Sequence, residues 1–327
     1  MTKRFFYSFT LLYRVTGWYL FFGLLSLTDV YGQLDTLSFL HITDTHLLFH
    51  ADHFPPGSIP QINHKSKSVK QFIHFIQTAP VATDSKMVVI TGDMIDFYET
   101  GDRKNDMFSL QIQQYANIPE ISQIPVFCAL GNHDIVTLAK NETKWVYQLT
   151  GHPGWNFSQN NAGKARAEWI RNVPCFAYGT WYSLVYKVGQ TGYRFIFLDN
   201  AYNCEILPLC PFIGYEQQHW LRDILEQSPD EVKIICMHIP FSTEWTSDPT
   251  RNALYVLLSQ YPSVKLVLAG DTHKNVINKF DGTGFIQVET AAFVSDAANW
   301  RLVKLTADKI IVSSTGTKQE ELIIPVR

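Results

Sequence analysis

The sequence of 327 residues is poor in charged side chains and has no excess of positive charge. Charged residues make up 17% of the chain, and 27 basic residues stand against 30 acidic ones, for a formal net charge of −3. A protein whose main purpose is to bind nucleic acid needs a basic surface, so this balance argues against nucleic acid as a partner. The 46% hydrophobic and 14% aromatic content excludes a disordered chain.

The chain also lacks an apolar run as long as a transmembrane helix, which needs about 20 residues. An apolar run of roughly 13 residues, from Val15 to Leu27, follows Lys3, Arg4 and Arg14 near the N-terminus. Small or neutral residues come next, up to Gly32. We therefore expect residues 1–32 to be a secretory signal peptide and the protein to be secreted, periplasmic or otherwise exported. An uncleaved membrane anchor is the alternative, and cleavage leaves a net charge near −5 with no stable membrane span.

The five cysteines contain no CxxC pair, so a cysteine zinc site is not expected. Cys204 and Cys210 lie in a proline-containing segment and are the best candidates for a disulfide in an exported protein. Cys128 and Cys236 lie inside apolar runs typical of strands, which indicates buried free thiols.

After the expected signal peptide, short β-rich apolar runs alternate with helical patterns, such as the one over residues 65–78. Further helices are expected near 105–117, 214–227 and 250–260, and a long irregular insertion over 135–181. No repeat or linker divides the chain, so residues 33–327 are predicted to be one domain. The order of strands and helices indicates an α/β (α+β) protein with mixed sheets and helices on the outside.

Polar side chains follow five of the apolar runs, at the point where each predicted strand ends. Because strand carboxyl ends converge on one crevice in such sheets, these side chains are expected to lie together. The runs 37–43, 87–91, 126–130, 233–237 and 265–269 are followed, in order, by Asp44-Thr45-His46, Gly92-Asp93, Gly131-Asn132-His133-Asp134, His238 and Gly270-Asp271-Thr272-His273.

Aspartate, asparagine and histidine are ligands of divalent metal ions. One such residue at a strand end is usually a capped turn, but five strand ends carrying them indicate a metal centre. Buried carboxylates and imidazoles also need counter-charge, which metal ions supply.

The ordered set of motifs resembles the calcineurin-like metallophosphoesterases, whose pattern is D-x-H, G-D-x-x-D, G-N-H-D, a lone H and G-H-x-H. The matching positions span about residues 37–280. The resemblance implies a four-layer αββα sandwich of two mixed β-sheets flanked by helices. It also implies two divalent or mixed-valence metal ions, which could be iron, manganese, magnesium or zinc.

The resemblance assigns roles to individual residues. Asp44, His46 and His273 are expected to hold one metal ion, Asp93 to bridge both, and Asn132 and His238 to hold the other. His133 is expected to contact the phosphate and assist the leaving group, with Asp134 holding its ring in position. Asp96, the last residue of the G-D-x-x-D motif, is expected to support the site through hydrogen bonds to the ligands.

Asp271 departs from the family pattern, because a histidine that ligates the second metal normally occupies this position. An aspartate can still coordinate, but it adds a negative charge. We expect an oxygen-richer second site that favours iron, manganese or magnesium over zinc. The alternative is a weakened second site.

The sequence thus predicts a phosphoric ester hydrolase that cleaves a small phosphate monoester or diester through a hydroxide bridging two metal ions. The alternative is a non-catalytic or weakly active member of the family that binds a phosphorylated ligand, owing to Asp271. Residues 47–60 and 135–181 are the expected substrate-facing loops. The natural substrate and the oligomeric state do not follow from the sequence.

Overall fold

The computed structural model describes residues 34–54, 62–101, 107–140, 155–201, 212–241 and 248–326. The expected signal peptide and the pair Cys204 and Cys210 lie outside these residues. The unit Asp35–Arg327 contains every helix and strand named below. Among the described residues, no helix combines the length and apolarity needed to cross a membrane.

Two six-stranded mixed sheets form the centre of the unit Asp35–Arg327. The first has the order β16 (Glu320–Pro325), β15 (Lys309–Ser313), β14 (Arg301–Leu305), β1 (Leu37–Ile42), β2 (Met87–Thr91) and β5 (Val126–Ala129). The second has the order β12 (Val276–Lys279), β13 (Ile286–Glu289), β11 (Val264–Ala269), β10 (Val232–Cys236), β9 (Thr191–Phe197) and β8 (Tyr182–Val188).

The strands that lead into the site motifs run parallel within each sheet. In the first sheet β1 pairs with β2 and β2 with β5, with Leu40 opposite Val88 and Val88 opposite Val126. In the second sheet β9, β10 and β11 are likewise parallel neighbours. Parallel pairing brings the carboxyl ends of these strands to the same edge of each sheet.

Alternating side chains along the strands build separate apolar layers. In β1, Leu40 and Ile42 join a core cluster with α3 (Ser68–Thr83), while Phe39 packs edge-on against Phe195 of β9 with ring centroids 5.2 Å apart. The strand period of two thus turns one face of β1 to helices and the other to the second sheet.

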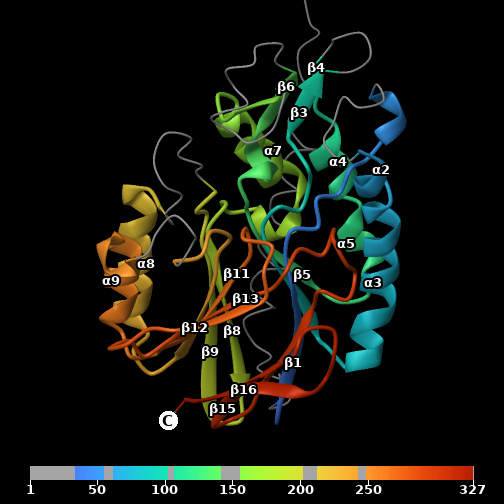
Figure 1. Cartoon of the computed structure of the whole chain (residues 1–327). Coiled ribbons are helices and arrows are strands. Elements are labelled where there is room, and N and C mark those ends of the chain that lie inside the picture. Colours follow the sequence, from blue (N-terminus) through green and yellow to red (C-terminus); the bar gives the residue numbers. More distant parts are fainter. Residues whose placement is uncertain are drawn as a thin grey trace, which may run out of the picture. The chain divides into compact units, whose positions relative to one another are not determined.

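Helices cover the outer faces of both sheets, which completes the predicted four-layer αββα arrangement (Figure 1). The first sheet packs against α3, α4 (Gln111–Tyr115), α5 (Ile118–Ile121) and α7 (Ala162–Asn172). The second packs against α8 (Tyr215–Gln227) and α9 (Ala253–Ser259). A short helix, α2 (Ile62–Lys65), precedes α3.

Two local expectations are corrected. The helix expected near 105–117 is only α4, and Met107–Phe108 form the strand β4 instead. The expected irregular insertion holds regular elements: β6 (Thr137–Lys140), β7 (Trp155–Ser158) and α7, with the 3₁₀ turn η3 (Pro174–Phe176). With β3 (Glu99–Gly101), the strands β4, β6 and β7 make a third sheet. Trp169 of α7 is fully buried in the core, and this burial explains the regular structure.

Candidate metal centre

The polar strand-end turns are held together by backbone hydrogen bonds. Asp44 N–H donates to Gly92 O at 3.0 Å, and Gly270 N–H donates to His238 O at 2.9 Å. Many of the turn residues have left-handed backbone conformations, which cost non-glycine residues free energy and cluster at functional sites. The site residues with positive φ are Asp44, His46, Asp93, Asp271 and His273.

Glycine is required where two of these turns approach each other most closely. A Cβ atom at Gly131 would overlap the Asp93 carboxylate, and one at Gly270 would overlap the Thr43 hydroxyl and the Asp44 carboxylate. Because Gly131 and Gly270 have no Cβ atom, the carboxylates of Asp93 and Asp44 can approach the turns that contain these glycines.

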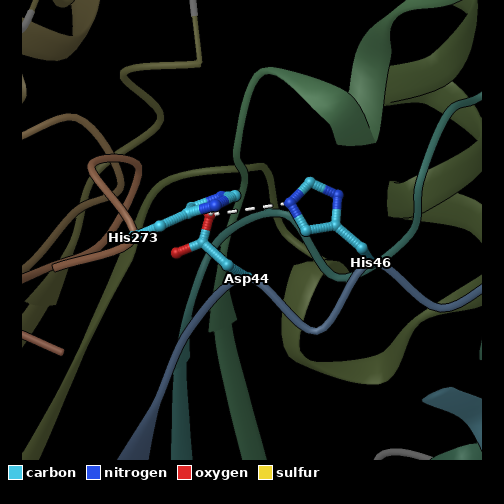
Figure 2. A group of neighbouring side chains, drawn as sticks. All are labelled: Asp44, His46 and His273. Carbon is cyan, nitrogen blue, oxygen red and sulfur yellow. Dashed lines mark ion pairs between the residues drawn. The ribbon is translucent and has the colours of Figure 1, made fainter. Parts of the chain in front are cut away.

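One group of candidate ligands consists of Asp44, His46 and His273 (Figure 2). Asp44 Oδ1 lies 3.2 Å from His273 Nε2 and 3.8 Å from His46 Nε2. Its other carboxylate oxygen is occupied, because it accepts hydrogen bonds from the Thr43 hydroxyl at 2.8 Å and from Asp271 N–H at 3.1 Å. One oxygen is thus fixed by the protein while the other faces two imidazoles.

A second group surrounds the buried imidazole of His238. Its Nε2 lies 3.0 Å from Asn132 Oδ1, 3.3 Å from Asp93 Oδ1 and 3.5 Å from Asp271 Oδ1. Its Nδ1 lies 2.7 Å from Thr91 O, which fixes this nitrogen as the N–H donor. This hydrogen bond to a backbone carbonyl leaves Nε2 available for a metal ion.

Asp93 lies between the two groups. Its Oδ2 is 3.5 Å from His46 Nε2 and its Oδ1 is 3.3 Å from His238 Nε2, while Oδ1 also accepts from His133 N–H at 2.9 Å. One carboxylate thus reaches both groups, which is the position of a bridging ligand.

The electrostatics of the site favour cations. Burial opposes ionisation of His238, but the carboxylates of Asp93, Asp44 and Asp271 together raise the pKa of His238 well above its usual value. Burial raises the pKa of Asp271 to about 6. The buried carboxylates around His238 therefore favour positive charge at this place.

The donor set fits two divalent metal ions. Within the described part of the chain, Asp44 Oδ1 and His46 Nε2 are buried without a hydrogen-bond partner, which is costly unless a cation satisfies them. The ligand atoms of Asp44, His46 and His273 lie within 4.8 Å of one another, as do those of Asp44, Asp93 and His238. Carboxylate, amide and imidazole donors together suit iron, manganese, magnesium or zinc.

Residues 37–275 match the family model described as calcineurin-like phosphoesterase. The chain belongs to the calcineurin-like phosphoesterase family. A dimetal phosphatase from Danio rerio has a similar fold, with a TM-score of 0.57 and 15% identity, over 89% of this chain and 99% of that one. GAP50, the anchor in the inner membrane complex of Plasmodium, has a TM-score of 0.51 and 13% identity over 89% of each chain. No curated protein matches the sequence.

The structure corrects the role predicted for Asp134 in this phosphoesterase. Its carboxylate accepts hydrogen bonds from the backbone N–H groups of Ile95 at 3.0 Å and Gly131 at 2.7 Å. The ring of His133 is held instead by the backbone carbonyl of Asp96, 2.7 Å from Nδ1. Asp134 therefore fixes the turns that carry the ligands, because a carboxylate pairs readily with two amide donors.

The His133 ring lies beside the first group of ligands. It meets the His46 ring edge-on, with centroids 4.6 Å apart, and its side chain is 21% exposed. With Nδ1 directed to the Asp96 carbonyl, Nε2 lies on the opposite side of the ring. The phosphoesterase thus has a partly exposed imidazole beside the predicted ligands, as the proton-donor role requires.

Lys65, at the end of α2, is a contributor that sequence reasoning missed. Its Nζ lies 2.5 Å from Asp96 Oδ1, and the same oxygen lies 3.3 Å from His46 Nδ1. Burial opposes ionisation of Asp96, but Lys65 together with the imidazoles of His46 and His133 lowers the pKa of Asp96. Asp96 thus lies between His46 and Lys65, and the positive charge of Lys65 favours the ionised form of Asp96. Lys65 follows no strand end, so the strand-end pattern carries no signal for it.

Asn200 was also missed, although the strand-end signal was present. It follows β9, and its Oδ1 accepts from His238 N–H at 2.9 Å and from Ile239 N–H at 3.2 Å. Asn200 therefore fixes the backbone that carries the His238 ligand.

Replacing Lys65 by methionine removes the cation that holds Asp96 while keeping most of the side-chain volume. We expect the Lys65→Met variant to lose about 10- to 100-fold in metal affinity or activity, the usual cost of removing support from a metal ligand. Metal titration and steady-state kinetics measure this loss. Lys67→Met, on the exposed turn between α2 and α3, is the matched control and should leave both unchanged.

Proposed function

We propose that this phosphoesterase is an exported, two-metal hydrolase that cleaves a small phosphate monoester or diester. The observation that carries the proposal is the convergence of seven ligand side chains on one place. Among them, Asp44 Oδ1 and His46 Nε2 are buried without a hydrogen-bond partner, and His133 lies beside His46. Two bound metal ions supply an activated water at neutral pH and neutralise the charge of the phosphate.

The residues of the chain have distinct tasks in this proposal. Asp93 contacts both ligand groups and so sets their separation. His133 presents Nε2 to the substrate because its Nδ1 is bonded to the Asp96 carbonyl. From that position it donates a proton to the oxygen of the leaving group, which would otherwise depart as a basic alkoxide.

Asp271 makes the second ligand group richer in oxygen than the family pattern. Its carboxylate lies 3.5 Å from His238 Nε2, the position from which it would share an ion with His238. The additional carboxylate oxygen favours iron, manganese or magnesium at this site. Zinc accepts nitrogen donors more readily than manganese or magnesium does, so it is less favoured here.

The Asp271→His variant tests the metal preference. We expect the replacement to shift the metal giving the highest activity towards zinc, because a neutral imidazole replaces a carboxylate. Activity of the apoprotein reconstituted with each metal measures the shift. Stoichiometric zinc with full activity in the wild type, or an unchanged preference in the variant, would contradict this account of Asp271.

Hydrolysis of bis-p-nitrophenyl phosphate and p-nitrophenyl phosphate, with each metal supplied in turn, tests the proposed function. Release of nitrophenolate from one or both substrates, lost on chelation and restored by metal, supports a hydrolase and separates diesterase from monoesterase activity. Phosphate binding with no hydrolysis under any metal would instead favour the non-catalytic, ligand-binding alternative, for which Asp271 is the supporting observation.

Export is tested separately by the N-terminus of the mature protein. Edman sequencing or intact mass of the protein recovered outside the cytoplasm should show a chain beginning at residue 33, as the basic start and short apolar run of residues 1–32 predict. A full-length chain in the membrane fraction would support the anchor instead.

A further inference from the structure

A separate cluster of metal-ligating side chains lies on the short 3₁₀ helix η1 (Ala51–His53) and on the residue before it. A ring nitrogen of His50, a carboxylate oxygen of Asp52 and a ring nitrogen of His53 lie within 4.8 Å of one another. The centroids of the two imidazole rings are 5.1 Å apart, and the ring planes are tilted by 33°. All three residues are exposed, and none belongs to the ligand groups of the metal centre described above.

The backbone of η1 brings the two histidines together. His53 N–H donates to His50 O at 2.9 Å, which is the hydrogen bond of a 3₁₀ turn. Side chains three residues apart lie over each other in such a turn, so the two imidazoles become neighbours. His50 itself has a left-handed backbone conformation, with φ of 55° and ψ of 44°. A non-glycine residue keeps such a conformation only where the surrounding structure holds it.

Buried neighbours hold this turn on both sides. The backbone N–H and carbonyl of Phe49 each make a hydrogen bond of 2.9 Å with the buried side-chain amide of Gln111. Leu48 before the turn and Phe54 after it are buried in one apolar cluster, in which Phe54 meets Phe97 edge-on with ring centroids 5.6 Å apart. Because the backbone is already fixed, binding of an ion would order only the exposed side chains, which lowers the entropic cost.

The donor set and its spacing suit a tetrahedral ion. Two imidazoles and one carboxylate form a known three-ligand set for zinc, in which water takes the fourth position. Donor atoms in such a site lie about 3.3 Å apart, because the bonds to zinc are close to 2 Å. The ligand atoms of His50, Asp52 and His53 therefore need to close by at most about 1.5 Å, a movement that exposed side chains make by rotating about their own bonds.

We propose that His50, Asp52 and His53 bind one zinc ion at an additional site, with water in the remaining coordination position. The set is rich in nitrogen, whereas the group that contains Asp271 is rich in oxygen, so the two places should select different metal ions. Binding at η1 needs only these three side chains, so a loss of hydrolytic activity would leave the additional site intact.

Equilibrium dialysis of the full chain against zinc, with its resident metal ions retained, measures the additional site. We expect the wild type to bind one zinc ion more than the double variant His50→Gln and His53→Gln, because glutamine has no imidazole nitrogen. The double variant His74→Gln and His219→Gln is the matched control, since it removes two exposed histidines from α3 and α8. It should bind as much zinc as the wild type. Equal zinc binding by the wild type and the η1 variant would overturn the proposal.

Histidine modification by diethyl pyrocarbonate, mapped by peptide mass spectrometry, shows where the zinc ion lies. Zinc should protect His50 and His53 from modification, because a ligated nitrogen is no longer nucleophilic, while His74 stays reactive. The Asp52→Asn variant should need a higher zinc concentration for the same protection. Modification of His50 and His53 at the same rate with and without zinc would overturn the proposal. Equal protection of His74 would also overturn it, since zinc would then bind exposed histidines without preference.

Discussion

We expect the His133→Ala variant to turn over phosphate esters at least 100-fold more slowly than the wild type while its metal content is unchanged. The side chain of His133 belongs to neither of the groups formed by Asp44, His46 and His273 and by Asp44, Asp93 and His238, although it lies beside His46 and Asp96. Its ring is instead oriented by the Asp96 carbonyl, 2.7 Å from Nδ1. A positioned proton donor contributes roughly 10²- to 10⁴-fold, so its loss should affect kcat and spare the metals.

Steady-state kinetics and elemental analysis of the same preparation measure the two quantities together. His74→Ala is the matched control, because His74 lies exposed on α3 and its loss should leave turnover unchanged. Turnover of His133→Ala within a few-fold of the wild type would assign proton donation to another group. A loss of metal together with activity would mean that His133 acts on the ligands instead.

The Asp93→Asn variant should lose at least one of the two metal ions and nearly all activity. Asparagine keeps the size of the side chain and can still accept from His133 N–H, but it removes the charge that faces both His46 and His238. Since removal of indirect support already costs 10- to 100-fold in affinity, loss of a bridging carboxylate should cost more than about 100-fold.

Metal stoichiometry after dialysis, measured by mass spectrometry of the elements, gives the readout. Asp84→Asn is a close control, because Asp84 also has a positive φ, 53° against 51° for Asp93, but is exposed and pairs with Lys86. The control should keep both ions. Two ions and wild-type turnover in Asp93→Asn would show that Asp93 does not bridge them.

Much of the fold and of the ligand set follows from the strand ends in the sequence. A buried strand such as β2 reads as an uninterrupted apolar run, and an aspartate after glycine at its end is conspicuous. Parallel pairing then brings such ends together, so the proximity of Asp44 to Asp93 and of His238 to Asp271 follows from topology. The structure places these candidates side by side, and the metal content of the variants tests their proposed roles as ligands.

The supporting contacts do not follow from any pattern. The backbone carbonyl of Asp96 accepts from His133, and backbone N–H groups donate to the Asp134 carboxylate. Every residue but proline has both backbone groups, so the sequence does not reveal these partners. Lys65 reaches Asp96 from a helix that only the tertiary fold brings near. Such contacts depend on chain geometry between distant segments, which spacing along the sequence does not encode.

Crystallographic location of the metal ions by anomalous scattering tests the central claim most directly. The account predicts two peaks about 3.5–4 Å apart. One should lie against Asp44, His46 and His273, the other against Asn132, His238 and Asp271, with Asp93 between them. A single peak, or ions bound away from these residues in a protein that hydrolyses phosphate esters, would contradict it.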